Sequence, residues 1–447
     1  MKSQVTRRTF FAGLGAGGFA TASRAAGKKP VILLRNGWQT INIGDIGHTP
    51  GALTLLDKYF PEAEVTLWPN KLTNEVREML MKGYPRLKIA DGSLNKQNQP
   101  DTPELARAWK EADFYLSGSG SGFPASTHAA AFHRATGKPY GVFAVSTDPI
   151  SGVGPGREAE GRTLKELRAK AQALPPTHIS PTLRSIVDGA SFFFCRDTIS
   201  RDYLKAQGVK TPILEFGPDS QLGMHLRDDA KGFAYLERNR LQEGKFICVI
   251  PRLRYTLPSH GPTAQGDSEI KDAINRRTCE KDHAKLRDLI VSYVKNTGNK
   301  VLACAEMTYQ VELAKKQLVD PLPEEIKKNV VWRDTFWMPD EAASVYSKAR
   351  AVISMECHSP LIALRNGAPT FYIREPTDTC KGQMYRDIGA DDWFFEVDET
   401  SGEQLWSRLA AIERDPAKAK AKVKSIMAFV EGKQKRMVDV VRAACHA

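Results

Sequence analysis

Short apolar runs recur along the chain, and each is followed by a polar or glycine-containing loop and a stretch with helical spacing. Apolar runs bounded by turn signals are typical of strands buried in a parallel sheet, and the helical stretches between them indicate βαβ units. The predicted strands are residues 30–34, 63–67, 112–116, 138–143, 245–250, 300–304, 330–332 and 370–373, with a further run that ends at Ile353.

This pattern divides the chain into two repeating halves separated by a polar stretch at residues 225–244. Each half has the strand–loop–helix–strand order of a Rossmann-like domain. We therefore expect an α/β protein with two Rossmann-like domains facing across a cleft, the first at residues 28–225 and the second at residues 240–400. Residues 401–447 are expected to form C-terminal helices whose many lysines face solvent.

The run that ends at Ile353 leads into a cluster of ionisable side chains. Ser354, Glu356, Cys357 and His358 stand in a polar turn, and the apolar helical face of residues 361–364 follows it. Backbone N–H groups at a helix start attract anions, and an imidazole beside them titrates near neutrality. The turn is a candidate anion site; the alternative is that His358 only caps the helix.

Two arginines follow the strand at residues 245–250. Arg252 and Arg254 alternate along an extended segment, so both side chains can point to the same side. Guanidinium groups hold carboxylates and phosphates through paired hydrogen bonds. They are candidates for binding an anionic ligand.

The first domain offers two further candidate sites, both in loops after strands. In the turn at residues 42–45, Gly44 allows close approach of the backbone to a ligand, and Asp45 is suited to accept hydrogen bonds from hydroxyls or to act as a base. The Ser/Gly-rich loop at residues 117–122 contains Ser119 and Gly120, whose backbone donors can approach a substrate. The alternative is structural for both: a helix-capping aspartate and an ordinary turn.

Charge and cysteine content narrow the range of partners. The chain has 447 residues and a formal net charge of +12, of which four positive charges lie in the first 26 residues. A basic surplus suits anionic ligands, but no basic run with interleaved aromatic residues or other nucleic-acid motif is present. The seven cysteines show no Cys-x-x-Cys spacing, so neither a structural metal site nor a redox dithiol is predicted.

Residues 1–26 have the features of an export signal. The sequence Thr-Arg-Arg-Thr-Phe-Phe at residues 6–11 resembles the twin-arginine consensus, and a glycine-rich apolar stretch and small residues follow it. We therefore expect a periplasmic or extracellular protein; the alternative is a cytoplasmic protein with a chance arginine pair. No later stretch has the ~18 apolar residues that a spanning helix needs, so no integral membrane segment is predicted in the mature chain.

The stretch around His358 resembles the C-terminal signature of the polysaccharide pyruvyl transferase family, a Ser-Met-Arg-x-His turn followed by an apolar helix and a Gly-x-Pro strand. The matching residues are Ser354, Met355, His358, Gly367 and Pro369. Glu356 stands where the family has arginine. The resemblance extends over residues 30–400 and includes the turn at 42–45 and the loop at 117–122.

The resemblance implies a glycosyltransferase-B-like fold and transfer of the pyruvyl group of phosphoenolpyruvate to two hexose hydroxyls of an exported or cell-envelope polysaccharide. Phosphoenolpyruvate is then the donor substrate, and no cofactor is expected. The expected catalytic residues are His358 and Asp45. The expected donor-binding residues are Arg252, Arg254, Ser354 and Glu356, and the expected acceptor-binding residues are Asn42, Gly44, Ser119 and Gly120.

Two observations favour other functions. A negative charge at Glu356 repels a phosphoryl group unless it pairs with an arginine, and an exported enzyme meets little phosphoenolpyruvate. The alternatives are a repurposed or non-catalytic glycan-binding protein of the same fold, and a glycosyltransferase that uses a nucleotide sugar.

Overall fold

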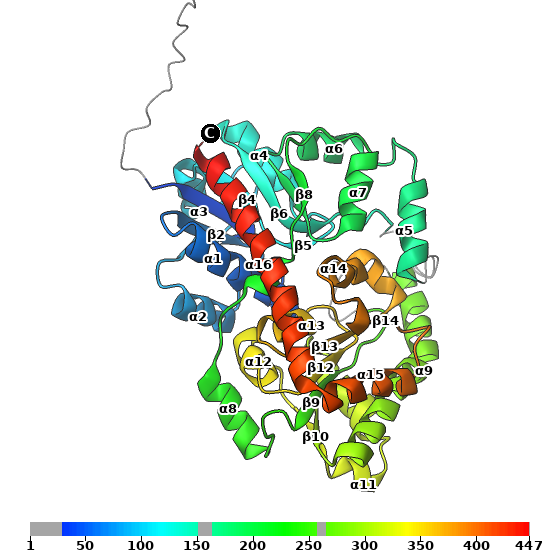
Figure 1. Ribbon diagram of the computed structural model, residues 1–447. Coiled ribbons are helices and arrows are strands. Elements are labelled where there is room, and N and C mark those ends of the chain that lie inside the picture. Colours follow the sequence, from blue (N-terminus) through cyan, green and yellow to red (C-terminus); the bar gives the residue numbers. More distant parts are fainter. Residues whose placement is uncertain (1–28, 151–162, 257–264, 447) are drawn as a thin grey trace, which may run out of the picture.

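The computed structural model describes residues 29–150, 163–256 and 265–446, so the predicted export signal at residues 1–26 lies outside the described residues. The chain forms two lobes, each built on a parallel sheet with helices on both faces (Figure 1). This arrangement confirms the predicted α/β fold with two Rossmann-like domains.

The N-terminal sheet has the order β3-β2-β1-β4-β6-β7-β8, with β5 paired to β6, and all its pairings are parallel. The central strands are buried on both faces, which explains their unbroken apolar sequence. Its strands are β1 (Val31–Asn36), β2 (Glu64–Pro69), β3 (Lys88–Ile89), β4 (Phe114–Ser117), β5 (Gly120–Ser121), β6 (Tyr140–Ser146), β7 (Phe193–Cys195) and β8 (Leu214–Phe216).

Helices cover both faces of this sheet, and a linker helix leads to the second domain. Side-chain caps define several of their starts; the helix that starts at Leu164 has a capping box at Thr163. The helices are α1 (Ile43–Tyr59), α2 (Asn74–Gly83), α3 (Pro103–Glu111), α4 (Ser126–Thr136), α5 (Leu164–Ala173), α6 (Pro181–Asp188), α7 (Thr198–Ala206), η2 (Ser220–Gly223) and α8 (Asp229–Arg238).

The C-terminal sheet has the order β11-β10-β9-β12-β13-β14 and is also wholly parallel. Its strands are β9 (Phe246–Ile250), β10 (Lys300–Ala303), β11 (Val330–Trp332), β12 (Ala351–Ser354), β13 (Thr370–Arg374) and β14 (Phe394–Glu396). Its helical segments are α9 (Gln265–Thr297), α10 (Gln310–Ala314), η4 (Lys315–Val319), α11 (Glu324–Lys327), α12 (Pro339–Tyr346), α13 (Ser359–Arg365), η5 (Pro376–Lys381), α14 (Gly382–Asp387), η6 (Asp391–Trp393) and α15 (Gly402–Arg414).

The last helix, α16 (Pro416–His446), belongs to both cores and runs along the two lobes (Figure 1). Its first half packs into the C-terminal core and its second half into the N-terminal core. The buried residues of these halves are Val423, Ile426 and Val430, followed by Met437, Val438 and Val441. The helix therefore packs against both domains through its apolar stripe, while most of its lysines remain exposed.

Helix α1 begins earlier than the sequence suggests. The segment at residues 42–45 looks like a turn because Gly44, Gly47 and Pro50 have poor helix propensity, yet the helix starts at Ile43. Asn42 is its N-cap, and its side-chain oxygen accepts hydrogen bonds from the backbone of Gly44 at 2.6 Å and Asp45 at 3.3 Å. Tertiary packing overrides propensity here, because α1 lies against η2 and α13.

His128 on α4 is a partly buried histidine beside an arginine. Its ring stacks on Trp68 with centroids 4.9 Å apart and accepts a hydrogen bond from Arg35 Nε at 3.3 Å. Burial, assisted by the Arg35 charge, lowers the pKa of His128 to about 4. Because the unfolded chain has a pKa near 6.5, it binds the proton first as pH falls.

We therefore expect the free energy of unfolding to fall between pH 6.5 and 4, and His128→Gln to remove part of that fall. Urea denaturation at pH 7 and pH 4.5 measures the difference. His133→Gln is the matched control, since His133 is an exposed residue of the same helix. Identical pH dependence in wild type and His128→Gln would contradict the expectation.

Candidate functional site

A cavity of about 280 Å³ lies where the carboxyl ends of the two sheets face one another. Both domains contribute to it, as expected for two doubly wound sheets that share a crevice. The lining residues are Trp38, Gln39, Asn42, Asp45, His48, Ser121, Pro124, Arg196, Arg252, Thr256, Met307, Glu356, His358 and Lys381. His358 and Arg252, from separate stretches of the C-terminal domain, and Asp45, from the N-terminal domain, therefore share one cavity.

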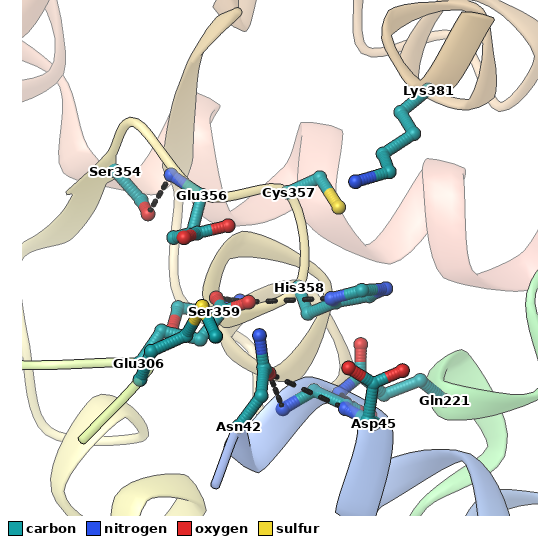
Figure 2. A network of polar contacts seen from close by, with 12 residues as sticks. Asn42, Asp45, Gln221, Glu306, Ser354, Glu356, Cys357, His358, Ser359 and Lys381 are labelled. Atoms are coloured by element: carbon teal, nitrogen blue, oxygen red, sulfur yellow. Dashed lines mark hydrogen bonds and ion pairs between the residues drawn. The ribbon is translucent and has the colours of Figure 1, made fainter. Parts of the chain in front are cut away.

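His358 stands at the start of α13, but its side chain does not cap the helix. Instead, the carboxylate of Glu306 accepts the backbone N–H of Ser359 at 2.5 Å and lies 3.2 Å from His358 Nδ1 (Figure 2). The position that the sequence suggested for a ligand anion, at the helix start, is thus occupied by a carboxyl group of the protein. His358 is oriented by a carboxylate that the sequence analysis did not single out.

Burial shifts the titration of both partners toward their neutral forms. It lowers the pKa of His358 to about 3, with the neighbouring His48 adding to the effect. It raises the pKa of Glu306 to about 7, and the hydrogen bond from Ser359 opposes that rise. At neutral pH His358 is an uncharged imidazole, able to accept or pass on a proton.

Gly44 makes room for His358 rather than for a ligand. A Cβ atom at Gly44 would overlap the His358 ring, so only glycine permits this approach between α1 and the turn before α13. Asn42, the second residue expected to contact the acceptor, has its side-chain oxygen committed to the cap of α1. The structure therefore gives both residues a packing role, although Asn42 also lines the cavity.

Asp45 points into the cavity from the first turn of α1 (Figure 2). Its side chain is 19% exposed and accepts a hydrogen bond from Gln39. His48, one turn further along, places Nδ1 3.9 Å from Asp45 Oδ1. A partly exposed carboxylate beside two imidazoles can act as a base toward a hydroxyl in the cavity.

Arg252 lines the cavity and is held by two carboxylates. Its Nε lies 3.3 Å from Glu356, and its Nη1 forms an ion pair with Asp378. Arg254 lies elsewhere: it is bound by Asp282 at 2.7 Å and by Asp398 at 2.8 Å, and it does not line the cavity. The two arginines, expected to act together, are therefore separated.

Glu356 is both paired and buried. Gln310 Nε2 donates to its Oε1 at 2.6 Å, the same oxygen that faces Arg252 Nε. Burial raises the pKa of Glu356 to about 8, against the opposing effect of Arg252. At neutral pH the group is largely protonated, so the repulsion of phosphate expected from its sequence position is reduced. Ser354 lies behind it and accepts the backbone N–H of Glu356 at 2.9 Å (Figure 2).

In the Ser/Gly-rich loop, the residues nearest the cavity differ from those expected. The Ser119 side chain is buried, donates to the carbonyl of Phe143 and accepts the backbone N–H of Ser220. Gly120 packs against Pro124, whose ring a side chain at position 120 would overlap. The next residue, Ser121, is exposed and lines the cavity.

Several cavity residues were missed at the level of sequence, among them Arg196, Lys381 and Trp38. Arg196 follows β7 and donates to Asp219 at 2.8 Å. Lys381 is the last residue of η5 and donates to Asp378 at 2.7 Å. The indole N–H of Trp38 donates to the Ser119 carbonyl. Arg196 carried a signal, since it stands directly after an apolar strand, as Arg252 does. Lys381 carried none.

The match to known families agrees with this geometry. The family model described as polysaccharide pyruvyl transferase matches residues 42–375. The chain belongs to the polysaccharide pyruvyl transferase family. No curated protein matches its sequence.

Solved structures place this pyruvyl transferase family member in the glycosyltransferase-B fold. Anabaena Alr3699/HepE in complex with UDP and glucose is similar over 93% of this chain and 100% of its own, at 10% identity and a TM-score of 0.50. S. aureus MnaA with UDP matches over 91% and 94% at 10% identity and a TM-score of 0.53. A UDP-N-acetylglucosamine 2-epimerase from Rickettsia bellii matches over 94% and 98% at 11% identity and a TM-score of 0.52.

At these identities the likeness establishes the fold alone. Within residues 29–150, 163–256 and 265–446 of the family member, none of the helices combines the length and apolar character needed to cross a membrane.

Proposed function

We propose that this protein transfers the pyruvyl group of phosphoenolpyruvate to two hydroxyls of a hexose in an exported or cell-envelope polysaccharide. The observation that carries the proposal is the shared cavity, in which Asp45 of one domain faces His358 and Arg252 of the other. Membership of the pyruvyl transferase family supports the reaction class.

The cavity suits an anionic donor because three cations line it. Arg196, Arg252 and Lys381 are each paired with a buried aspartate, Asp219 or Asp378, which fixes their positions before a ligand arrives. Preorganised cations stabilise negative charge without reorganisation at the moment of reaction. We assign the donor phosphate and carboxylate to this side of the cavity.

The acceptor belongs on the side of α1. Forming the ketal requires two hydroxyl protons to leave: one is gained by the methylene carbon of the donor, which becomes a methyl group, and the other leaves with inorganic phosphate. In our proposal Asp45 accepts a hydroxyl proton and the neutral His358 relays protons to the donor. Ser121 and Trp38 border the same space and contact the sugar.

Phosphate release with phosphoenolpyruvate and hexose-containing oligosaccharides tests the proposal. We expect Asp45→Asn to lower turnover by about 100-fold or more, the range typical of a lost general base. Asp57→Asn is the matched control, because Asp57 lies on the same helix with its side chain 48% exposed. Wild-type protein that releases no phosphate with any such acceptor, or an Asp45→Asn variant with full turnover, would refute it.

A nucleotide-sugar glycosyltransferase is the second candidate, favoured by the UDP bound in two of the structures of similar fold. A third is a glycan-binding protein without catalysis, favoured by the replacement of the family arginine with Glu356. Calorimetric titration separates them: UDP binding supports the second, and glycan binding without turnover supports the third.

We also propose that the first 26 residues direct export of the folded protein, on the resemblance of residues 6–11 to the twin-arginine consensus. Cell fractionation tests this: the full-length chain is expected in the periplasm or medium, and substitution of both arginines by lysine should retain it in the cytoplasm. Retention of the unaltered chain in the cytoplasm would refute export.

A further inference from the structure

Three potential metal ligands meet at the floor of the cavity, although they lie far apart in the sequence. His48 comes from α1, Asp219 from the residue before η2, and His358 from the turn before α13. One donor atom from each lies within 4.8 Å of the other two. Their exposed fractions are 0%, 1% and 5%, so the cluster is inside the protein rather than on its surface.

The imidazoles of this cluster have unused nitrogen atoms. Nδ1 of His48 and Nε2 of His358 make no hydrogen bond with the described residues, whereas Nε2 of His48 is paired with Asp219. His48 Nε2 lies 3.3 Å from Asp219 Oδ2, and the two rings stand edge to face with centroids 5.0 Å apart. Buried polar atoms without partners are uncommon and call for a ligand.

The groups behind the cluster fix the ligands in the orientation that metal binding requires. His358 Nδ1 is held by the Glu306 carboxylate at 3.2 Å, which leaves Nε2 as the free donor. Asp219 Oδ1 accepts the backbone N–H of Gln221 at 2.9 Å, and Oδ2, which faces His48, also accepts a hydrogen bond from Arg196 Nη1 at 2.8 Å. A carboxylate behind a ligating histidine is the usual outer contact of a metal-binding imidazole.

We propose that His48, Asp219 and His358 bind one divalent transition-metal ion of the zinc and iron(II) class. Two imidazoles and one carboxylate are a ligand set for such ions and leave coordination positions open. Those positions face the cavity, because His48 and His358 both line it. A bound ion occupies Nε2 of His358, so in that state His358 holds the ion and does not relay a proton; the metal site itself does not depend on the identity of the donor substrate.

The charge balance around the cluster is compatible with a cation. Arg196 donates to Asp219 Oδ2 and to Ser146, both at 2.8 Å, so its positive charge lies beside one of the three ligands. Asp45 and Glu306 supply two further carboxyl groups next to the imidazoles. Donors around a tetrahedral ion lie about 3.3 Å apart for bonds near 2.0 Å, so the ion draws the three side chains closer together.

Such an ion has a structural consequence as well as a chemical one. Its ligands come from both domains, so it fixes α1 against the turn before α13. An oxygen of a substrate that enters the open positions lies next to Asp45, which is also in the cavity. The ion thereby adds a positive centre to the three paired cations.

Titration of metal-stripped protein with Co²⁺ tests the proposal without any substrate. We expect visible absorption bands that saturate at one equivalent and are displaced by Zn²⁺, together with a raised unfolding temperature. His48→Gln and His358→Gln should each weaken Co²⁺ binding at least tenfold, the loss of one of three ligands. His133→Gln, which removes an exposed histidine on α4, should leave binding unchanged.

Wild-type protein that shows neither these bands nor bound metal after purification would overturn the proposal, whether or not the variants fold. Full Co²⁺ binding by a folded His48→Gln variant would overturn it equally. Circular dichroism establishes folding in each case. Because phosphoenolpyruvate is absent from the titration, failure of the proposed pyruvyl transfer does not affect the result.

Discussion

Replacing Gly44 with alanine should abolish the activity of the cavity while most of the fold persists. The added methyl group would overlap the His358 ring, and neither partner can yield easily. His358 is fixed by Glu306, and the helix carrying residue 44 is capped by Asn42. Overpacking of this kind costs about 1–3 kcal/mol in unfolding free energy and moves side chains from their positions.

Two measurements check this expectation: the free energy of unfolding in urea, and phosphate release as described above. We expect turnover to fall by about 100-fold or more, since small displacements of a catalytic group have effects of that size. Gly432→Ala is the matched control, because Gly432 lies in α16 with nothing within 4 Å of an added Cβ. That control should stabilise the helix by about 0.5–1 kcal/mol. Wild-type stability of Gly44→Ala would show that α1 adapts to the methyl group.

Replacing Glu306 with glutamine is expected to have a comparably large effect through His358. The carboxylate accepts hydrogen bonds on both sides, from the Ser359 backbone and at His358 Nδ1. A glutamine can accept on only one side; if its oxygen meets Ser359, its NH₂ group faces Nδ1 and forces the proton to Nε2. We expect turnover to fall by about 100-fold or more with little change in KM.

A purely structural role for Glu306 would leave the tautomer of His358 unchanged, so the decisive measurement is the nitrogen NMR signal of that imidazole. We expect the proton on Nδ1 in the wild type and on Nε2 in Glu306→Gln. Glu324→Gln is the control, since Glu324 is an exposed acid paired only with Lys327 among the described contacts. An unchanged tautomer together with wild-type turnover would show that Glu306 does not position His358 for the reaction.

Much of the fold could be predicted because buried strands have a recognisable apolar sequence. Strands in the middle of a parallel sheet are covered on both faces, so they read as unbroken apolar runs, and β1, β9 and β12 were recognised in this way. Capping residues such as Thr163 also mark helix starts locally. These signals come from residues that are close together in the chain, so they can be recognised in the sequence alone.

The site was predictable only in part, because its contacts join residues that are distant in the chain. Arg252 and Arg254 look equivalent in sequence, but Asp282 and Asp398 hold one of them away from the cavity. Gly44 looked like a residue for ligand approach, and the ring it admits belongs to His358.

The sequence by itself determined two parallel α/β domains, the family, and the positions of His358, Asp45 and Arg252 after apolar strands. Only the tertiary structure decided which of their neighbours act with them. Glu306 reaches His358 from a different loop, and burial in the contact between domains makes that imidazole neutral. The physical reason is that burial and ion pairing depend on groups distant in the chain, whereas apolar periodicity and helix capping depend on adjacent ones.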